Sequence, residues 1–343
     1  MFRMANAFKN LFDRGAYFSL RLIPPEAAHD LGKWAMRRRL LAPGPYVMEE
    51  KSRPVLFGNQ LPNPLGLAAG FDKNAEIVDA AIDYGFGFVE VGSVTFRGGS
   101  GNPKPRMFRL DDQTLMNRMG LNGDAAEIVA ARLAVVRSPL FGVNIAKTHS
   151  PDILGDAAIA DILGSYRLLA RFGMYTAINV SCPNTKEGRT FEDPGPLAEL
   201  LAALNQARAG TSNPPLVVKL SPVLDPLEET GAQRLEQVLN VCESAMVNGY
   251  ICCNTQPIDH PKFGRGGLSG NAVRPKAQRM AEFIAGRLSR PVIGCGGIYN
   301  RQHLDGYLQR GCIAAQVYNG FVRGPLAGVR FAHRLLQSGI RPK

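Results

Sequence analysis

Long hydrophobic runs, paired cysteines and clustered histidines are all absent from this chain of 343 residues. No stretch of about 18 uninterrupted apolar residues occurs, so the sequence predicts no membrane-spanning helix, and the N-terminus lacks the pattern of a secretory signal. The six cysteines show no CxxC spacing and the five histidines are isolated, so no metal site is expected. Five of the cysteines lie in or beside apolar segments or helices, which is typical of reduced thiols in a cytosolic protein.

What the chain has instead is a series of eight apolar segments of strand length. Most are continuously apolar, which is typical of parallel strands covered on both faces. Helical patterns at 197–209, 233–248 and 277–288 separate the later segments, so the sequence predicts βαβ units. The segments are residues 65–69, 88–92, 141–146, 175–180, 216–220, 249–253, 292–295 and 313–318.

Polar or glycine-rich residues stand at or just after the carboxyl end of each segment. The clearest case is the fourth, which delivers Asn179 from the strand's end and Cys182 from the following loop. A closed barrel brings all eight ends to one rim, whereas an open doubly wound sheet, the alternative, would scatter them. We therefore predict an α/β fold, a (β/α)8 TIM barrel over residues 42–343, preceded by a helical extension at residues 1–41.

The positive charge is concentrated in that extension. Of the formal net charge of +11, residues 1–41 carry +5, from eight Lys and Arg against three acids. The segment contains two amphipathic helical patterns, and the second begins at Pro24-Pro25-Glu26. Such a basic pair favours a module that lies on a membrane surface, and helices that simply cap the barrel's side are the alternative. Nucleic acid is not expected as a partner, because the basic residues lack interleaved stacking aromatics.

Glycine-rich loops follow the last two strands. Gly294-Cys-Gly-Gly297 follows the seventh, and Tyr318-Asn-Gly320 follows the eighth. Barrels often bind phosphate at these loops, because glycine lets backbone N–H groups approach the anion, so the pair predicts a phosphorylated cofactor. Lys219 ends a buried strand, where it either stabilises the negative charge of a reduced flavin or forms an internal ion pair with a carboxylate.

Seven motifs spread over nearly the whole chain resemble those of the dihydroorotate dehydrogenases. The branch that the chain resembles is class 2, which is quinone-dependent and membrane-associated. The assignment to this branch rests mainly on residues 1–41, where Pro-Glu-Ala-Ala-His at 25–29 is similar to the family's quinone-tunnel segment. The motifs are NPLGLAAGFDK at 63–73, VEVGSVT at 89–95, GNPKPRMFR at 101–109, NRMG at 117–120, NVSCPNT at 179–185, GGLSG at 266–270 and GCGG at 294–297.

The resemblance implies FMN as cofactor, oxidation of dihydroorotate to orotate in de novo UMP synthesis, and electron transfer to ubiquinone or menaquinone. It also implies a peripheral enzyme on the cytoplasmic face of a bacterial inner membrane, with a mitochondrial inner membrane as the alternative. The implied cofactor-binding residues are Ala69, Gly70, Lys73, Ser93, Asn144, Asn179, Lys219, Cys253, Gly270, Gly297, Tyr318 and Asn319. The implied substrate-binding residues are Lys73, Asn117, Arg118, Met119, Gly120, Leu121, Asn179, Asn184, Asn254 and Thr255. His29, Arg109 and Tyr318 would line the quinone's path.

One residue departs from the class 2 pattern at the reacting centre. Cys182 stands where class 2 enzymes have Ser, whereas class 1 enzymes use Cys as the base that takes the C5 proton. A thiol has a reference pKa of about 8.5, so we expect Cys182 to be this base. Two lesser departures are Cys253, near the flavin, and Asn319, by the phosphate. They leave open a paralogous FMN barrel acting on another pyrimidine ring, such as a dihydrouridine synthase, or a non-catalytic flavin-binding protein.

Overall fold

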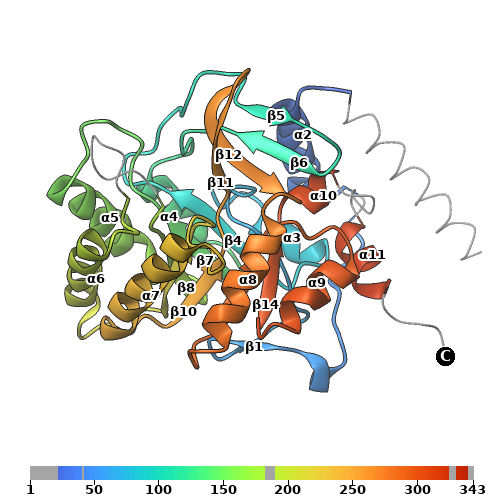
Figure 1. Ribbon diagram of the computed structural model, residues 1–343. Coiled ribbons are helices and arrows are strands. Elements are labelled where there is room, and N and C mark those ends of the chain that lie inside the picture. The colour runs from blue at the N-terminus through green and yellow to red at the C-terminus, as the bar shows by residue number, and fades with distance from the viewer. Residues whose placement is uncertain (1–21, 41, 182–189, 324–329, 339–343) are drawn as a thin grey trace, which may run out of the picture.

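The computed structural model describes residues 22–40, 42–181, 190–323 and 330–338. Eight parallel strands form a closed barrel (Figure 1), so the predicted TIM barrel is confirmed. Each predicted apolar segment coincides with one of these strands, although β4 extends two residues beyond the predicted 88–92, and every strand is buried along nearly its whole length. In chain order they are β3 (Leu65–Leu67), β4 (Phe88–Val94), β7 (Phe141–Ile145), β8 (Tyr175–Asn179), β9 (Leu216–Leu220), β10 (Gly249–Cys252), β13 (Val292–Cys295) and β14 (Ala314–Val317).

Helices cover the outside of the barrel between successive strands. The three predicted helices exist but begin three or four residues earlier than expected. For α6 and α8 the reason is a proline in the first turn, whose fixed φ suits a helix start. The helices after β3 are α3 (Val78–Asp83), α4 (Ala126–Leu133), α5 (Asp156–Leu169), α6 (Pro194–Arg208), α7 (Glu229–Ser244), α8 (Arg274–Ala285), α9 (Arg301–Leu308), α10 (Asn319–Arg323) and α11 (Phe331–Gln337).

The interior of the barrel has an apolar floor. Phe88, Tyr175, Val217 and Ile293 belong to one buried cluster there. A short 3-10 turn (Glu50–Ser52) and a hairpin of β1 (Val55–Leu56) and β2 (Asn59–Gln60) precede the barrel, and Leu56 of this hairpin joins the cluster. The floor fills the amino-terminal part of the barrel with apolar side chains, so polar groups of the barrel gather toward the carboxyl ends of the strands.

A second, four-stranded antiparallel sheet, which we call the roof, lies over that end of the barrel (Figure 1). Its strands come from two excursions of the chain, one after β4 and one after β10. The sequence did not predict it, because its strands are mixed in polarity and rich in glycine. They are β5 (Met107–Arg109), β6 (Thr114–Asn117), β11 (Gln256–His260) and β12 (Gly264–Gly270).

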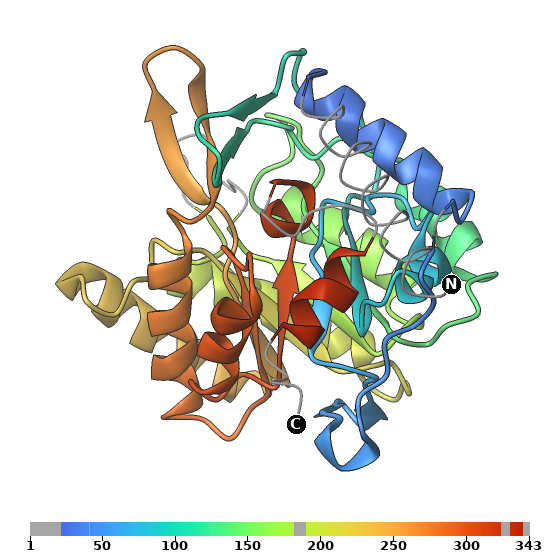
Figure 2. The ribbon, with the colours of Figure 1, turned by 90° about the vertical axis from the view of Figure 1, so that its right-hand side faces the viewer.

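The N-terminal helix α2 (Pro25–Arg37) begins at the predicted proline and lies beside the roof. Figure 2 shows the β11–β12 hairpin rising on one side of the molecule and α2 on the other. Ion pairs join α2 to the barrel, from Lys33 to Glu76 and from Arg39, just past its end, to Asp83. In contrast, Leu31 and Trp34 are 46% and 52% exposed. Within the described residues, no helix is long and apolar enough to cross a membrane.

Candidate active site

A cavity of about 750 Å³ lies between the barrel's rim and the roof. Leu115 and Asn117 of β6 and Gly266 of β12 line its outer side. The cavity therefore receives residues from the ends of the barrel strands and from both excursions. Its lining includes these residues singled out from the sequence: Ala69, Gly70, Lys73, Ser93, Asn117, Arg118, Met119, Gly120, Leu121, Asn179, Lys219, Cys253, Asn254, Thr255, Gly270, Gly297, Tyr318 and Asn319.

A few of the predicted site residues lie elsewhere. Asn144 is fully buried behind Ser93, to which it is hydrogen-bonded, and does not line the cavity. His29, which belongs to α2, and Arg109, which contacts the chain just before α2, also lie outside the lining. Cys182 and Asn184 fall outside the described residues, and the described part of the segment stops at Ser181, which lines the cavity.

Lys219 forms the buried ion pair that was one of its two sequence interpretations. Its ammonium nitrogen lies 3.0 Å from Oε1 of Glu90, a fully buried carboxylate in the middle of β4. Burial alone lowers the pKa of a lysine, but the attraction of Glu90 outweighs it and the pKa of Lys219 is raised. Because Lys219 also lines the cavity, the ion pair leaves the lysine beside the ligand space, and its role toward a flavin stays a prediction.

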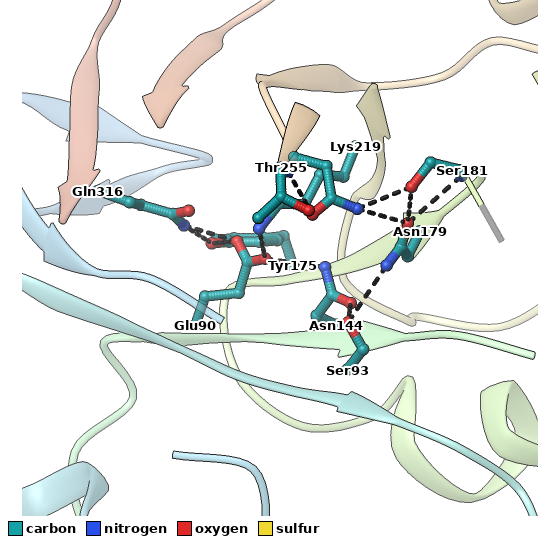
Figure 3. Close-up of polar contacts among 10 residues, drawn as sticks. Glu90, Ser93, Asn144, Tyr175, Asn179, Ser181, Lys219, Thr255 and Gln316 are labelled. Carbon is teal, nitrogen blue, oxygen red and sulfur yellow. Dashed lines mark hydrogen bonds and ion pairs between the residues drawn. The ribbon is translucent and has the colours of Figure 1, made fainter. Parts of the chain in front are cut away.

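A row of amides and hydroxyls runs from Glu90 across the rim (Figure 3). Asn144 donates from Nδ2 to Oε1 of Glu90 at 2.8 Å, and its Oδ1 accepts from the Ser93 hydroxyl at 2.5 Å. Ser93 in turn accepts from Nδ2 of Asn179 at 3.4 Å, and Oδ1 of Asn179 accepts from Nδ2 of Asn254 at 3.2 Å. The row thus supplies oriented neutral donors and acceptors to the inner wall of the cavity.

Lys73 stands apart from this row, on the side of the cavity toward α2. Its Nζ donates to Oδ1 of Asn122 at 2.7 Å. Burial, followed by the positive charge of Arg106, lowers the pKa of Lys73 to about 8. Within the described residues no carboxylate lies at ion-pair distance from Lys73, so the protein does not match the charge of this lysine.

The two glycine loops meet at the far end of the cavity. Gly297 has a φ of +65°, and a Cβ there would come within 2.6 Å of the Cβ of Arg274 and 2.8 Å of the Gly270 carbonyl oxygen. Only glycine therefore lets the loop pack this tightly. Nδ2 of the adjacent Asn319 donates to the Gln113 carbonyl at 3.1 Å, and its buried Oδ1 has no hydrogen-bond partner among the described residues.

His29 connects α2 to the cavity. Its Nδ1 lies 3.3 Å from the hydroxyl of Tyr318, and its ring packs edge-on against Phe71 with centroids 4.7 Å apart. Burial and then the charge of Lys73 lower the pKa of His29 to about 3, so the ring is neutral at physiological pH. Arg109 donates from Nη1 to the Ile23 carbonyl at 2.8 Å, just before α2 begins. Of the residues predicted for a quinone path, His29 and Tyr318 are in contact where α2 meets the barrel, and Arg109 of the roof contacts the chain just before the same helix.

Sequence reasoning overlooked three residues that shape the site. Glu90 belongs to the VEVGSVT motif, but no role was expected for it. Asn122 accepts the hydrogen bond from Lys73, and Gln316 donates a hydrogen bond to Glu90 at 2.6 Å. A usable signal existed for Glu90 and Gln316, because a charged or amide side chain within a buried strand must find a partner. Attention to the strand ends alone missed both.

Comparisons with known proteins agree with one another. A family model described as dihydroorotate dehydrogenase matches residues 53–338. The dihydroorotate dehydrogenase (quinone) of Natronomonas pharaonis is 40% identical over 317 residues, 88% of this chain and 87% of that protein. The protein of the same name from Thermus thermophilus is 38% identical over 338 residues, 93% of each chain. A crystal structure of ligand-free DHODH from Eimeria tenella has a TM-score of 0.77 at 29% identity, covering 91% of this chain and 94% of that one.

Proposed function

The chain belongs to the dihydroorotate dehydrogenase family and oxidises dihydroorotate to orotate in pyrimidine biosynthesis with a quinone as acceptor; from this premise we propose how its cavity does so. Our proposal is that the cavity holds FMN against the barrel rim, with dihydroorotate between the cofactor and the roof. The observation that carries it is the convergence of the predicted cofactor and substrate residues on one cavity of about 750 Å³. We found no observation that favours another pyrimidine ring as substrate.

The residues present suit FMN in three respects. The loops at Gly270 and Gly297 give a glycine cradle for a phosphate, and the unpartnered Oδ1 of Asn319 can accept from a hydroxyl of the ribityl chain. The Lys219 ammonium suits the negative charge of a reduced isoalloxazine. When bound, FMN would accept the hydride from dihydroorotate and pass the electrons on to the quinone.

The substrate is bound by charge at one end and by neutral groups at the other. The ammonium of Lys73 is available for the carboxylate of dihydroorotate, because no protein carboxylate within the described residues competes for it. Asn179 and Asn254 present amides to the ring's carbonyl and N–H groups, and Asn117 does so from the roof. A buried site built from such hydrogen bonds rejects rings that cannot form them.

For the base we propose Cys182, which directly follows Ser181 in the chain. Its support is the sequence alone: Cys182 stands where the family's motif has its base, and a thiol ionises more readily than a hydroxyl. Cys182→Ala should slow flavin reduction by dihydroorotate by about 10²- to 10⁴-fold, in the range usual for losing a positioned base. Orotate binding should change little. Flavin reduction at the wild-type rate in this variant would place the base elsewhere.

The exposed face of α2 supports attachment to a membrane surface. Leu31 and Trp34 are solvent-exposed while ion pairs fix the other side of the helix to the barrel, and Arg37 and Arg38 stand exposed at its end. We propose that this face docks peripherally on the cytoplasmic side of a bacterial inner membrane, where ubiquinone or menaquinone reaches His29. Leu31→Ser with Trp34→Ser should weaken sedimentation with anionic vesicles while sparing flavin reduction by dihydroorotate.

One experiment tests the central proposal. The purified protein should be yellow, should release FMN on denaturation, and should be bleached by dihydroorotate without oxygen and recoloured by a short-chain quinone. A folded preparation that binds no FMN would overturn the cofactor assignment. A flavin that dihydroorotate leaves oxidised would overturn the placement of substrate beside it.

A further inference from the structure

Glu90 is a buried acid with no place in the chemistry described so far. It lies two residues beyond Phe88 of the apolar floor and three before Ser93, which lines the cavity, so it stands between the floor and the cavity. Four donors from four other strands converge on its carboxylate. They are Lys219 at 3.0 Å and Asn144 at 2.8 Å on Oε1, and Tyr175 at 2.9 Å and Gln316 at 2.6 Å on Oε2.

Every one of these contacts places a donor against Glu90. A protonated carboxyl group would need to donate one hydrogen bond, whereas an ionised one only accepts. The set of four donors therefore selects the carboxylate. The polar row leads to the same conclusion, because each member from Asn254 through Asn179, Ser93 and Asn144 donates toward Glu90. Glu90 is the terminal acceptor that fixes which way these side chains point.

We infer that Glu90 is a positioning residue that keeps Lys219 in its ammonium form. In this way it sets how strongly the site favours reduced flavin, an inference that rests on the proposed function. Without a carboxylate partner, a lysine buried this deeply is favoured in its neutral form. A neutral Lys219 would no longer offset the charge that the flavin gains on reduction.

Glu90 is the charged partner on which Lys219 depends. Among the described residues, the titratable groups that act most strongly on Lys219 are Glu90 on β4, Cys295 on β13 and Cys253 after β10. Burial raises the pKa of both thiols, and burial followed by Glu90 raises the pKa of the Tyr175 hydroxyl. These groups are neutral at physiological pH, so Glu90 is the carboxylate that can hold the proton on Lys219.

The test is the pH dependence of the flavin's reduction potential in the FMN-loaded wild type, Glu90→Gln and Lys219→Met. At low pH, where Lys219 is charged, Glu90→Gln should be easier to reduce than the wild type because a negative charge is gone. As the pH rises, the lysine of this variant should lose its proton before the paired lysine of the wild type does, and the two curves should cross. Above the pH of the crossing, the equilibrium constant for reduction of the flavin should be at least tenfold lower in Glu90→Gln than in the wild type. This corresponds to a potential about 30 mV lower for a two-electron reduction. Lys219→Met should be similarly hard to reduce at every pH.

Asp161→Asn is the matched control, because Asp161 is a buried carboxylate on α5 that accepts from the Thr148 backbone and does not contact the polar row. Its potential should follow the wild-type curve. If Glu90→Gln fails to fold, Glu90→Asp and Glu90→Asn give the same contrast between a charged and a neutral side chain, with a shorter side chain. Only the potential of Glu90→Asn should then cross the wild-type curve.

Two outcomes would overturn the inference. If the reduction potential of Glu90→Gln changes with pH in parallel with that of the wild type, Lys219 keeps its proton without Glu90. If the potentials of Lys219→Met coincide with those of the wild type, this lysine does not act on the flavin. Neither touches the proposed function, which fails separately if the wild-type protein binds no FMN.

Discussion

The two lysines of the cavity lie in regions that treat positive charge in opposite ways. On the inner wall, Lys219 is paired with Glu90, and the pKa of the lysine is raised despite its burial. On the side toward α2, beside Asn122, Lys73 has no carboxylate partner within the described residues, and burial lowers its pKa to about 8. A cation matched by the protein is a fixed part of the site, whereas an unmatched one is completed by the charge of a ligand. Removing each charge in turn tests this difference.

The largest effect should come from removing the unmatched charge. Lys73→Met should weaken orotate binding and raise the KM for dihydroorotate by on the order of 10²- to 10³-fold, the usual cost of breaking a buried ion pair. Titration of the flavin spectrum with orotate measures it. Lys276→Met, which removes an ion pair between Lys276 and Glu228 at the surface, is the control and should bind orotate normally. Wild-type affinity in Lys73→Met would mean that the substrate carboxylate lies elsewhere.

A smaller effect separates the two lysines by pH. Lys73 carries its proton below a pH of about 8 and loses it above. Because only the charged form attracts a carboxylate, orotate affinity should be level below this pH and fall by about tenfold per pH unit above it. Orotate binding should also take up a proton at pH 9, measurable by calorimetry in buffers of different ionisation heat. The raised pKa of Lys219 predicts no such step from the inner wall, and a level affinity up to pH 10 would contradict the assignment to Lys73.

The smallest effect should come from charges on the N-terminal helix. Glu26 of α2 lies 2.7 Å from Arg106, whose guanidinium is among the groups that lower the pKa of Lys73. Glu26→Gln removes a negative charge that raises this pKa and leaves Arg106 without its partner. The alkaline limit of orotate binding should therefore move to lower pH, with roughly threefold weaker binding at pH 8. Asp79→Asn, which removes an exposed contact to Arg137, should leave the limit unchanged.

The barrel could be predicted from the sequence because each of its strands can be recognised from its own short apolar segment. The segment 216–220, which is apolar except for Lys219, is expected in the buried sheet, and a residue near its carboxyl end must reach the rim. The partner of Lys219 could not be predicted, since it depends on how β4 and β9 face each other across the closed barrel. The strands of the roof were missed for a related reason: Gly264–Gly270 is mostly half-buried and has no apolar pattern, so only its pairing with distant segments makes it a strand.

That pairing has a consequence for the order in which the protein acquires its structure. Asn117 of β6 lies opposite Gly267 of β12, 150 residues later in the chain. A contact between residues this far apart in sequence costs a large loop-closure entropy, which the contact offsets only once it has formed. The intervening chain contains four of the eight barrel strands. The pairing of β6 with β12 in the roof therefore forms only after six of the eight barrel strands have been synthesised. We expect competence to bind orotate to be a late event in refolding, reached well after the helical circular dichroism has recovered.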